Sequence, residues 1–283
     1  MVANAFTCTG PYAILILLGL KRVENRSAMP VPAKGRCAIS CSKSFCKEEY
    51  GEFVRWAARA LKPEEFETIP AWCEVKGWPG KVVGCCDYVC NGRDARCPSA
   101  TWDEGYPYWW KLSEVVAFDQ PIPCRGNVGM WQMPAGLAAQ ATAADRLARA
   151  VGERIATAED AAELFRLAVP VADGSEGVFV LPLDEGRRVL AEPILVSLGT
   201  SSVTTAVQPS EVFGAALKER AKAVVVAHNH PSGNLVPSLQ DVELTSVLKR
   251  LGDVLGITVL DHLIIGGDSF AAVPCANREG EEK

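Results

Sequence analysis

The stretch AVVVAHNHPSG, residues 223–233, constrains the fold of this chain more than any other feature. A short run of small and β-branched apolar residues is typical of a buried strand, and this one leads directly to two of the chain's three histidines. A helix follows, with a capping serine at Ser238 and a glycine stop at Gly256. A buried strand joined to a long helix predicts an α/β sheet with a polar turn at its edge.

The pattern around this stretch alternates between strands and helices. Thr157 and Asp160 have the spacing of a helix start with a capping carboxylate. Strands are predicted at 177–183, 191–199, 201–207 and 223–228, helices from 157, from Ser210 and over 238–255, and two last strands within 257–273. The apolar face predicted for the helix over 238–255 consists of Val242, Val247, Leu248, Leu251 and Leu255. The second half therefore reads as a mixed α/β domain.

Composition divides the chain into parts. Residues 1–133 are rich in Trp, Cys and Pro, whereas the residues that follow become alanine-rich with helical periodicity. A chain of 283 residues is comfortable for two domains. We therefore expect a first domain over 1–133, a helical linker over 134–156, a second domain over 157–276 and a charged tail over 277–283.

Overall composition is that of a globular protein, with 22% charged and 48% hydrophobic residues. The net charge of −5 argues against wholesale binding to a phosphate backbone, although a local basic face stays possible. The longest early apolar run, residues 12–20, is far shorter than the ~20 residues of a membrane span and lacks the flanks of a secretory signal. The expectation is a cytoplasmic protein that does not interact with membranes.

Ten of the eleven cysteines lie between Cys8 and Cys124. An odd total without a secretory signal favours free thiols over a disulfide framework. A zinc site is the alternative, built from members of the set Cys37, Cys41, Cys46, Cys85, Cys86, Cys90 and Cys97. None of these forms a Cys-x-x-Cys pair, and several lie in apolar segments, so the spacing favours packing over metal binding.

The two histidines of the opening stretch have the spacing of metal ligands. In an extended segment His228 and His230 project to the same side, while Asn229 faces away. Asp241 lies in the first turn of the helix capped by Ser238, and two neutral imidazoles with one carboxylate form a zinc set that leaves a fourth position for water. The alternative is a polar turn whose histidines bond backbone groups. The complete ligand set favours a catalytic metal.

A hydrolytic zinc site also needs a base that takes a proton from water. Glu176 lies just before the strand at 177–183 and is the candidate for this role. His262, in LDHLIIG, precedes an apolar stretch, which favours a structural or ligand-supporting role over direct metal binding.

The segment HNHPSGNLVPSLQD resembles the His-x-His-x10-Asp motif of the JAMM (JAB/MPN) zinc metalloproteases, which include deubiquitinating isopeptidases. The RadC-like branch is the closer match, because SEGVFVLPLDEGRRVL, GTSSVTTAVQPSEVFGAAL and LDHLIIGGDSF also fit it in order over about 155–275. The resemblance implies a mixed sheet flanked by helices and one Zn²⁺ per chain on His228, His230 and Asp241. It further implies Glu176 as general acid/base and Ser238 as a donor to the tetrahedral oxyanion.

The first half contains a polar cluster, GLKRVENRS, directly after the apolar run. Taken alone, these residues favour a solvated helix end over the wall of a cleft. However, GLKRVENRS, KGRCAISCSKSF, GKVVGCCDYV and YWWKLSEVVAFDQPIPCRGNVGMWQMP resemble, in order, an ASCH domain over about 8–133. That resemblance implies a mainly-β, PUA-like barrel with a cleft for RNA or a modified nucleoside, and Lys21, Glu24 and Arg26 at its signature positions.

Four tryptophans of the first half could stack on bases or fill the barrel core: Trp102, Trp109, Trp110 and Trp131. Two functions follow from the sequence. The first is a zinc metallopeptidase of the JAMM type, in which activated water attacks a peptide or isopeptide bond while the first domain recognises RNA, a nucleoside or a protein partner. The alternative is a nucleic-acid-binding or nucleic-acid-processing protein whose metal domain is not a protease.

Overall fold

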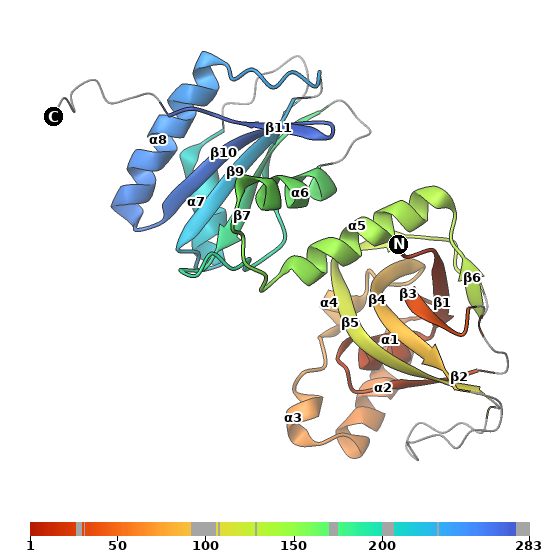
Figure 1. Cartoon of the computed structure of the whole chain (residues 1–283). Helices are drawn as coiled ribbons and strands as arrows, with labels where there is room; N and C mark the ends of the chain where they lie inside the picture. The colour runs from red at the N-terminus through yellow and green to blue at the C-terminus, as the bar shows by residue number, and fades with distance from the viewer. Residues whose placement is uncertain are drawn as a thin grey trace. The chain divides into compact units, whose positions relative to one another are not determined.

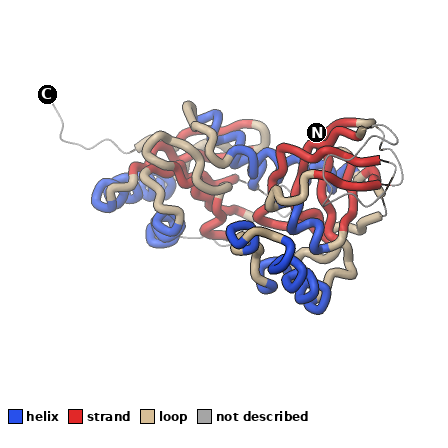
Figure 2. The backbone as a smooth tube through the Cα atoms, turned by 90° about the horizontal axis from the view of Figure 1, so that it is seen from below, coloured by secondary structure: helices blue, strands red, loops and turns tan. Residues whose placement is uncertain are grey.

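The computed structural model describes residues 1–26, 30, 32–91, 106, 108–127, 129–169, 175–199, 207–230 and 232–275. The chain divides into two compact units, Met1–Ala148 and Arg149–Lys283 (Figure 1). Each unit combines a sheet with helices that lie beside it (Figure 2). Among the described residues, no helix has both the length and the apolar character that crossing a membrane requires.

The first unit is built on a six-stranded sheet that curls into a half-barrel, in the order β2-β5-β4-β3-β1-β6 (Figure 1). The strands are β1 Asn4–Cys8, β2 Val23–Arg26, β3 Lys34–Cys41, β4 Lys81–Cys90, β5 Tyr108–Pro123 and β6 Met130–Gln132. Neighbouring strands are antiparallel except for the parallel pair β1 and β3. The helices are α1 Gly10–Leu17, α2 Lys47–Ala60, α3 Pro63–Phe66, α4 Trp72–Val75 and α5 Ala135–Ala150.

Helix α1 is formed by the apolar run noted above and is buried against the sheet and α2. Most of its side chains are inaccessible to solvent, which explains its hydrophobic character on several sides. Trp110 and Trp131 are also buried and belong to the core of this unit, whereas Trp102 lies outside the described residues. The core-filling alternative is therefore correct for Trp110 and Trp131.

The cysteines of the described segments are all free thiols, and Cys37, Cys41, Cys85 and Cys86 are buried in the sheet. Burial raises the pKa of Cys41 to about 12, so this thiol is inert at neutral pH. The burial of these four cysteines agrees with the packing prediction. Cys97 lies outside the described residues.

Helix α5 occupies most of the segment expected to be a linker. Its residues Ala138 and Ala141 pack into a cluster with Val2, Ala5 and Trp131 of the first unit. The alanine-rich composition thus serves close packing on this core, because small side chains let the helix approach the sheet.

The second unit contains a five-stranded mixed sheet in the order β11-β10-β9-β7-β8. Its strands are β7 Glu176–Leu183, β8 Ile194–Gly199, β9 Ala223–Asn229, β10 Thr258–Gly266 and β11 Ser269–Ala272. Only β9 and β10 are parallel among these described pairs. Helices α7 Pro209–Lys218 and α8 Leu239–Leu255 cover one face, and α6 Ala158–Ala168 lies on the other (Figure 1). Residues 201–206 of the predicted strand at 201–207, and the tail, lie outside the described residues.

The predicted helix signals are confirmed at α6 and α8. Thr157 and Asp160 form a reciprocal capping box, and Ser238 and Asp241 form another. Gly256 ends α8 in the left-handed conformation, with φ 68°. The start predicted for α7 at Ser210 is wrong, because Pro209 is already helical there and needs no hydrogen-bonded N–H at a first-turn position.

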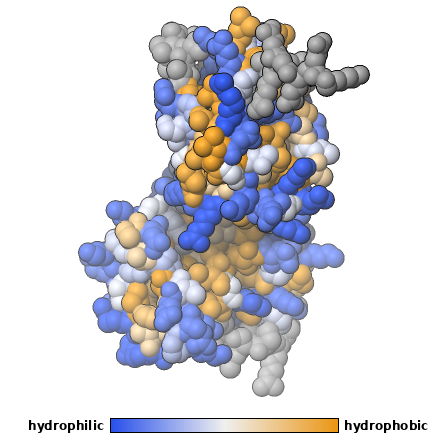
Figure 3. Space-filling view, turned by 90° about the vertical axis from the view of Figure 1, so that its left-hand side faces the viewer, coloured by the Kyte–Doolittle hydropathy of each residue, from blue (hydrophilic) through white to orange (hydrophobic). Residues whose placement is uncertain are grey.

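The apolar face predicted for α8 is wrong in part. Leu248 is buried as expected, but Leu251 and Leu255 are exposed. The buried stripe instead contains Thr245, Leu248 and Gly252. Small residues on this stripe allow α8 to lie close to the sheet, and several large apolar side chains remain at the surface. On the face drawn in Figure 3, apolar residues are likewise interspersed among hydrophilic ones.

Gly252→Ala should lower the free energy of unfolding by about 1–3 kcal/mol, as expected for overpacking. A Cβ atom at this position would lie 2.4 Å from the carbonyl oxygen of Ile257, so the helix end would have to shift. Gly214→Ala, in α7, is the matched control because nothing lies within 4 Å of its added methyl group; it should gain roughly 0.5–1 kcal/mol from helix propensity. Urea unfolding of both variants measures the difference, and equal effects would contradict the close approach at Gly252.

Candidate metal centre

Strand β9 delivers His228 to the middle of the second sheet. His228 pairs with Val178 of β7 on one side and with Ile264 of β10 on the other. His228 is buried at 3% exposure, so its backbone and ring have little freedom. His230 lies just past the strand end, where its N–H donates to the carbonyl of Ile265 at 3.0 Å and continues the ladder to β10.

The two imidazoles converge as the spacing predicts. Nε2 of His228 lies 3.0 Å from Nε2 of His230. On the far side of its ring, Nδ1 of His230 contacts the carbonyl oxygen of Asn234 at 2.5 Å. A carbonyl can only accept, so Nδ1 of His230 carries the proton and Nε2 presents a lone pair toward His228.

Asp241 is placed beside His228 by the capping box of α8, although it does not belong to the mutually close group of Glu176, His228 and His230. The hydroxyl and the backbone N–H of Ser238 both donate to Oδ2 of Asp241 at 2.7 Å. The other carboxylate oxygen, Oδ1, lies 3.4 Å from Nε2 of His228. The cap therefore starts the helix and also orients one carboxylate oxygen toward the histidines.

Glu176 is the first residue of β7 and joins the same group. One oxygen of its carboxylate and one ring nitrogen each of His228 and His230 lie within 4.8 Å of one another. Glu176, His228 and His230 are thus a set that could hold a metal, and Asp241 offers a further oxygen beside His228.

Asn229 holds the backbone on both sides of Glu176, a role that the sequence analysis missed. Its Oδ1 accepts from the N–H of Gly177 at 2.8 Å, and its Nδ2 donates to the carbonyl of Ser175 at 2.9 Å. The sequence does contain a signal for this role, because Asn229 lies between His228 and His230. Its side-chain amide offers a donor and an acceptor that can bond the backbone of a neighbouring strand.

His262 lies behind His228 rather than at the shared point. Its Nε2 is 3.0 Å from Nδ1 of His228, and its Nδ1 is 2.7 Å from the hydroxyl of Thr245 on α8. This placement agrees with a role in supporting a ligand.

Burial sets the protonation states of the site. It lowers the pKa of His228 to about 4, opposed by Asp241 and assisted by His230, and it lowers the pKa of His262 to about 3. Burial acts to raise the pKa of Asp241, but the hydrogen bonds from Ser238 outweigh it and the pKa is lowered. Neutral imidazoles and an ionised carboxylate at pH 7 are the forms that bind metals.

Two separations around His228 match the spacing of ligands on a small divalent ion. With metal–nitrogen bonds of about 2.0–2.1 Å, neighbouring ligand atoms of a tetrahedral zinc site lie roughly 3.3 Å apart. The separations of 3.0 Å between the histidine nitrogens and 3.4 Å to Asp241 are close to this value. Imidazole and carboxylate ligands suit zinc and related transition metals.

The polar cluster of the first unit is buried, so the expectation of a solvated helix end is wrong. Lys21 is fully buried, and its Nζ donates to the carbonyl of Val23 at 2.6 Å and lies 3.4 Å from Glu24. Arg26 pairs with the other oxygen of Glu24 at 2.7 Å. Strand β5 pairs with this segment, and Trp110 lies opposite Glu24 in the sheet.

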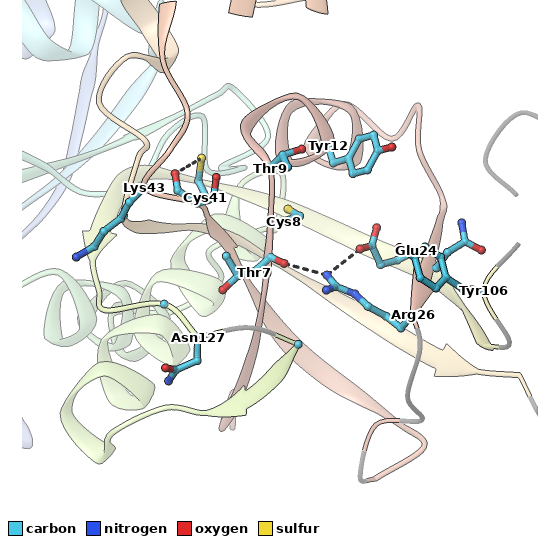
Figure 4. A pocket seen from close by; sticks show the side chains of 15 residues that line it. Thr7, Cys8, Thr9, Tyr12, Glu24, Arg26, Cys41, Lys43, Tyr106 and Asn127 are labelled. Atoms are coloured by element: carbon cyan, nitrogen blue, oxygen red, sulfur yellow. Dashed lines mark hydrogen bonds and ion pairs between the residues drawn. The ribbon is translucent and has the colours of Figure 1, made fainter. Parts of the chain in front are cut away.

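A pocket of about 630 Å³ opens beside this network (Figure 4). Glu24 and Arg26 line it, together with Tyr12, Tyr106 and Lys43. Figure 4 shows the Arg26 guanidinium between Glu24 and the backbone carbonyl of Thr7, which accepts at 2.9 Å. The described tryptophans do not line this pocket, so its aromatic surface comes from tyrosines.

Comparison with known proteins assigns a family to the second unit. Residues 155–278 match the RadC-like JAB domain. The chain is 38% identical to a UPF0758 protein of Chlorobaculum parvum over 126 residues, which is 44% of this chain and 55% of the relative. UPF0758 proteins of Finegoldia magna and Staphylococcus epidermidis are 42% and 39% identical over 33% and 34% of this chain, and 41% and 42% of their own lengths. The chain thus spans about half the length of the curated relatives it matches.

The metal-free protein should become less stable as the pH falls from about 6.5 toward 4. Unfolded histidines bind protons near pH 6.5, whereas His228 and His262 in the folded state have pKa values of about 4 and 3. The unfolded state therefore binds more protons in this window, and the free energy of unfolding decreases with falling pH. Urea unfolding in a chelator at pH 7 and pH 5 measures this loss. Equal stability at the two pH values would contradict the buried, neutral state of the two histidines.

Proposed function

We propose that the second unit is a zinc-dependent hydrolase of the JAMM type that cleaves a peptide or isopeptide bond. The observation that carries the proposal is the convergence of His228, His230 and Glu176, with a carboxylate oxygen of Asp241 3.4 Å from His228. The match of this unit to the RadC-like JAB domain supports it.

His228, His230 and Asp241 would hold one Zn²⁺ per chain through two imidazole nitrogens and one carboxylate oxygen. The bound ion would supply Lewis acidity, which polarises an amide carbonyl and lowers the pKa of bound water to about 7. The capping box contributes by holding Oδ2 of Asp241, which leaves Oδ1 on the side of the histidines.

Glu176 would act as the general base and then as the general acid. Its carboxylate would take a proton from the attacking water and return it to the leaving nitrogen as the C–N bond breaks. Asn229 fixes the backbone at both neighbours of Glu176, so the carboxylate is positioned by a rigid strand.

Ser238 would donate to the oxyanion of the tetrahedral intermediate. Its hydroxyl donates to Oδ2 of Asp241 in this structure, so it must turn toward the substrate. The backbone N–H of Ser238 still holds Oδ2 when this happens. Such an oxyanion donor is typically worth about 3 kcal/mol of barrier.

Glu176→Gln should keep about one zinc per chain and lose hydrolysis of peptide or isopeptide substrates by about 10²–10⁴-fold, the range for general acid–base catalysis. His228→Ala should lose both zinc and activity. Glu185→Gln, at an exposed turn of the same unit, is the control and should change neither. Metal content by mass spectrometry and turnover on a substrate panel give the answer. Unchanged turnover with Glu176→Gln would rule out Glu176 as the general base. Loss of zinc in that variant would instead identify Glu176 as a metal ligand.

A second function is supported by the pocket of the first unit. We propose that this unit is an ASCH-like, PUA-like module that binds a modified nucleoside or single-stranded RNA. The buried ion pairs of Glu24 with Lys21 and Arg26 place charged hydrogen-bonding groups at a cavity of nucleoside size. The net charge of −5 favours recognition of a base over general attraction to phosphates. If this module directs the chain to nucleic acid, the metal unit serves nucleic-acid processing rather than proteolysis.

Arg26→Gln should weaken nucleoside or RNA binding by roughly tenfold or more, the effect of losing a hydrogen bond to a charged group. Arg22→Gln is the matched control, since Arg22 is exposed and donates locally to the carbonyl of Gly19 at 3.0 Å. Titration calorimetry at low salt with a panel of nucleosides and short RNAs measures both. Absence of binding by the unaltered protein would exclude this function.

A further inference from the structure

We infer that Thr245 and His262 are positioning residues that fix the tautomer of His228, so that its Nε2 lone pair faces the metal position. This inference rests on the metal centre proposed above. Thr245 lies on α8 and His262 on β10, and their exposures are 0% and 1%. Neither residue belongs to the group of candidate ligands.

Hydrogen bonds connect Thr245 to His262 and His262 to His228, and this relay begins at the hydroxyl of Thr245. Oγ1 lies 2.6 Å from the carbonyl oxygen of Asp241, and a carbonyl can only accept, so the hydroxyl proton is used there. Oγ1 also lies 2.7 Å from Nδ1 of His262. With its single proton already donated, the hydroxyl must accept at this contact, and therefore Nδ1 of His262 carries a hydrogen.

The second step runs between the two buried rings. His262 is enclosed and its nitrogens face a hydroxyl oxygen and another imidazole, surroundings that favour a neutral ring with one proton. Since that proton is on Nδ1, Nε2 of His262 is an acceptor. Nδ1 of His228, 3.0 Å away, must then donate to it, and the lone pair of His228 is left on Nε2.

The outcome is a pair of lone pairs directed at one point. His230 gains the same tautomer directly from the carbonyl of Asn234. The two Nε2 atoms lie 3.0 Å apart and repel each other as acceptors, whereas a cation bound by both converts this repulsion into attraction. Oδ1 of Asp241 adds negative charge beside them. The relay therefore prepares the site for a cation.

The opposite tautomer would close the site. With the proton on Nε2, His228 would donate to Nε2 of His230 and the two candidate ligands would satisfy each other. Thr245→Val removes the acceptor for Nδ1 of His262, which favours moving that proton to Nε2 and reversing the direction of the relay. Thr245 is separated from the metal position by His262 and His228. Replacing its hydroxyl by a methyl group should nevertheless shift His228 to the tautomer that carries its proton on Nε2.

Ring-nitrogen NMR of the metal-free protein tests this tautomer directly. The unaltered protein should give a pyridine-type ¹⁵N shift for Nε2 of His228, and Thr245→Val should give a pyrrole-type shift. Zinc affinity, measured by chelator competition, should fall about 10–100-fold in Thr245→Val, the usual effect of losing support for a metal ligand. Thr245→Ser keeps the hydroxyl and should restore both readouts.

A pyrrole-type Nε2 on His228 in the unaltered protein would overturn the inference without any variant. Equal zinc affinity in Thr245→Val and Thr245→Ser would also overturn it. A pyridine-type shift with no zinc binding would instead overturn the proposed metal centre, because the tautomer is read in the absence of metal. The two failures are therefore distinguishable.

Discussion

The 3.0 Å approach of the His228 and His230 ring nitrogens is the constraint on which the second unit depends. Two acceptors are stable at this distance only if their rings are held from behind. The carbonyl of Asn234 holds one ring, and the buried pair of His262 and Thr245 holds the other. The arrangement explains why α8 carries a threonine and a glycine on its buried face, because bulkier residues would move the helix and this support away from β10.

The first unit contains buried charged groups that are likewise held in place by their neighbours. Lys21 and Glu24 are removed from water, which is costly unless they are paired. Glu24 lies between two cations, Lys21 and Arg26, and Arg26 also donates to a backbone carbonyl. Glu24 and Arg26 of this network line the pocket. The unit thereby concentrates polar groups with fixed directions where a small ligand would contact them.

The sequence predicted what depends on local spacing and could not predict what depends on distant pairing. The capping boxes of Thr157 and Ser238 and the common side of His228 and His230 follow from offsets of two or three residues. The hydrogen bond between Asn229 and Gly177, by contrast, joins residues 52 positions apart. The same holds for the cluster of the first unit, where pairing with the distant strand β5 places in a sheet a segment that resembles a solvated helix end.

Strand β9 presents ligands on one side and Asn229 on the other, in a single register with β7. Because side chains alternate along a strand, a slip of one position would turn both histidines away and bring the amide to the front. His228 and the clamp on Glu176 are therefore gained or lost together, which makes correct pairing of β9 a condition for assembly of the centre.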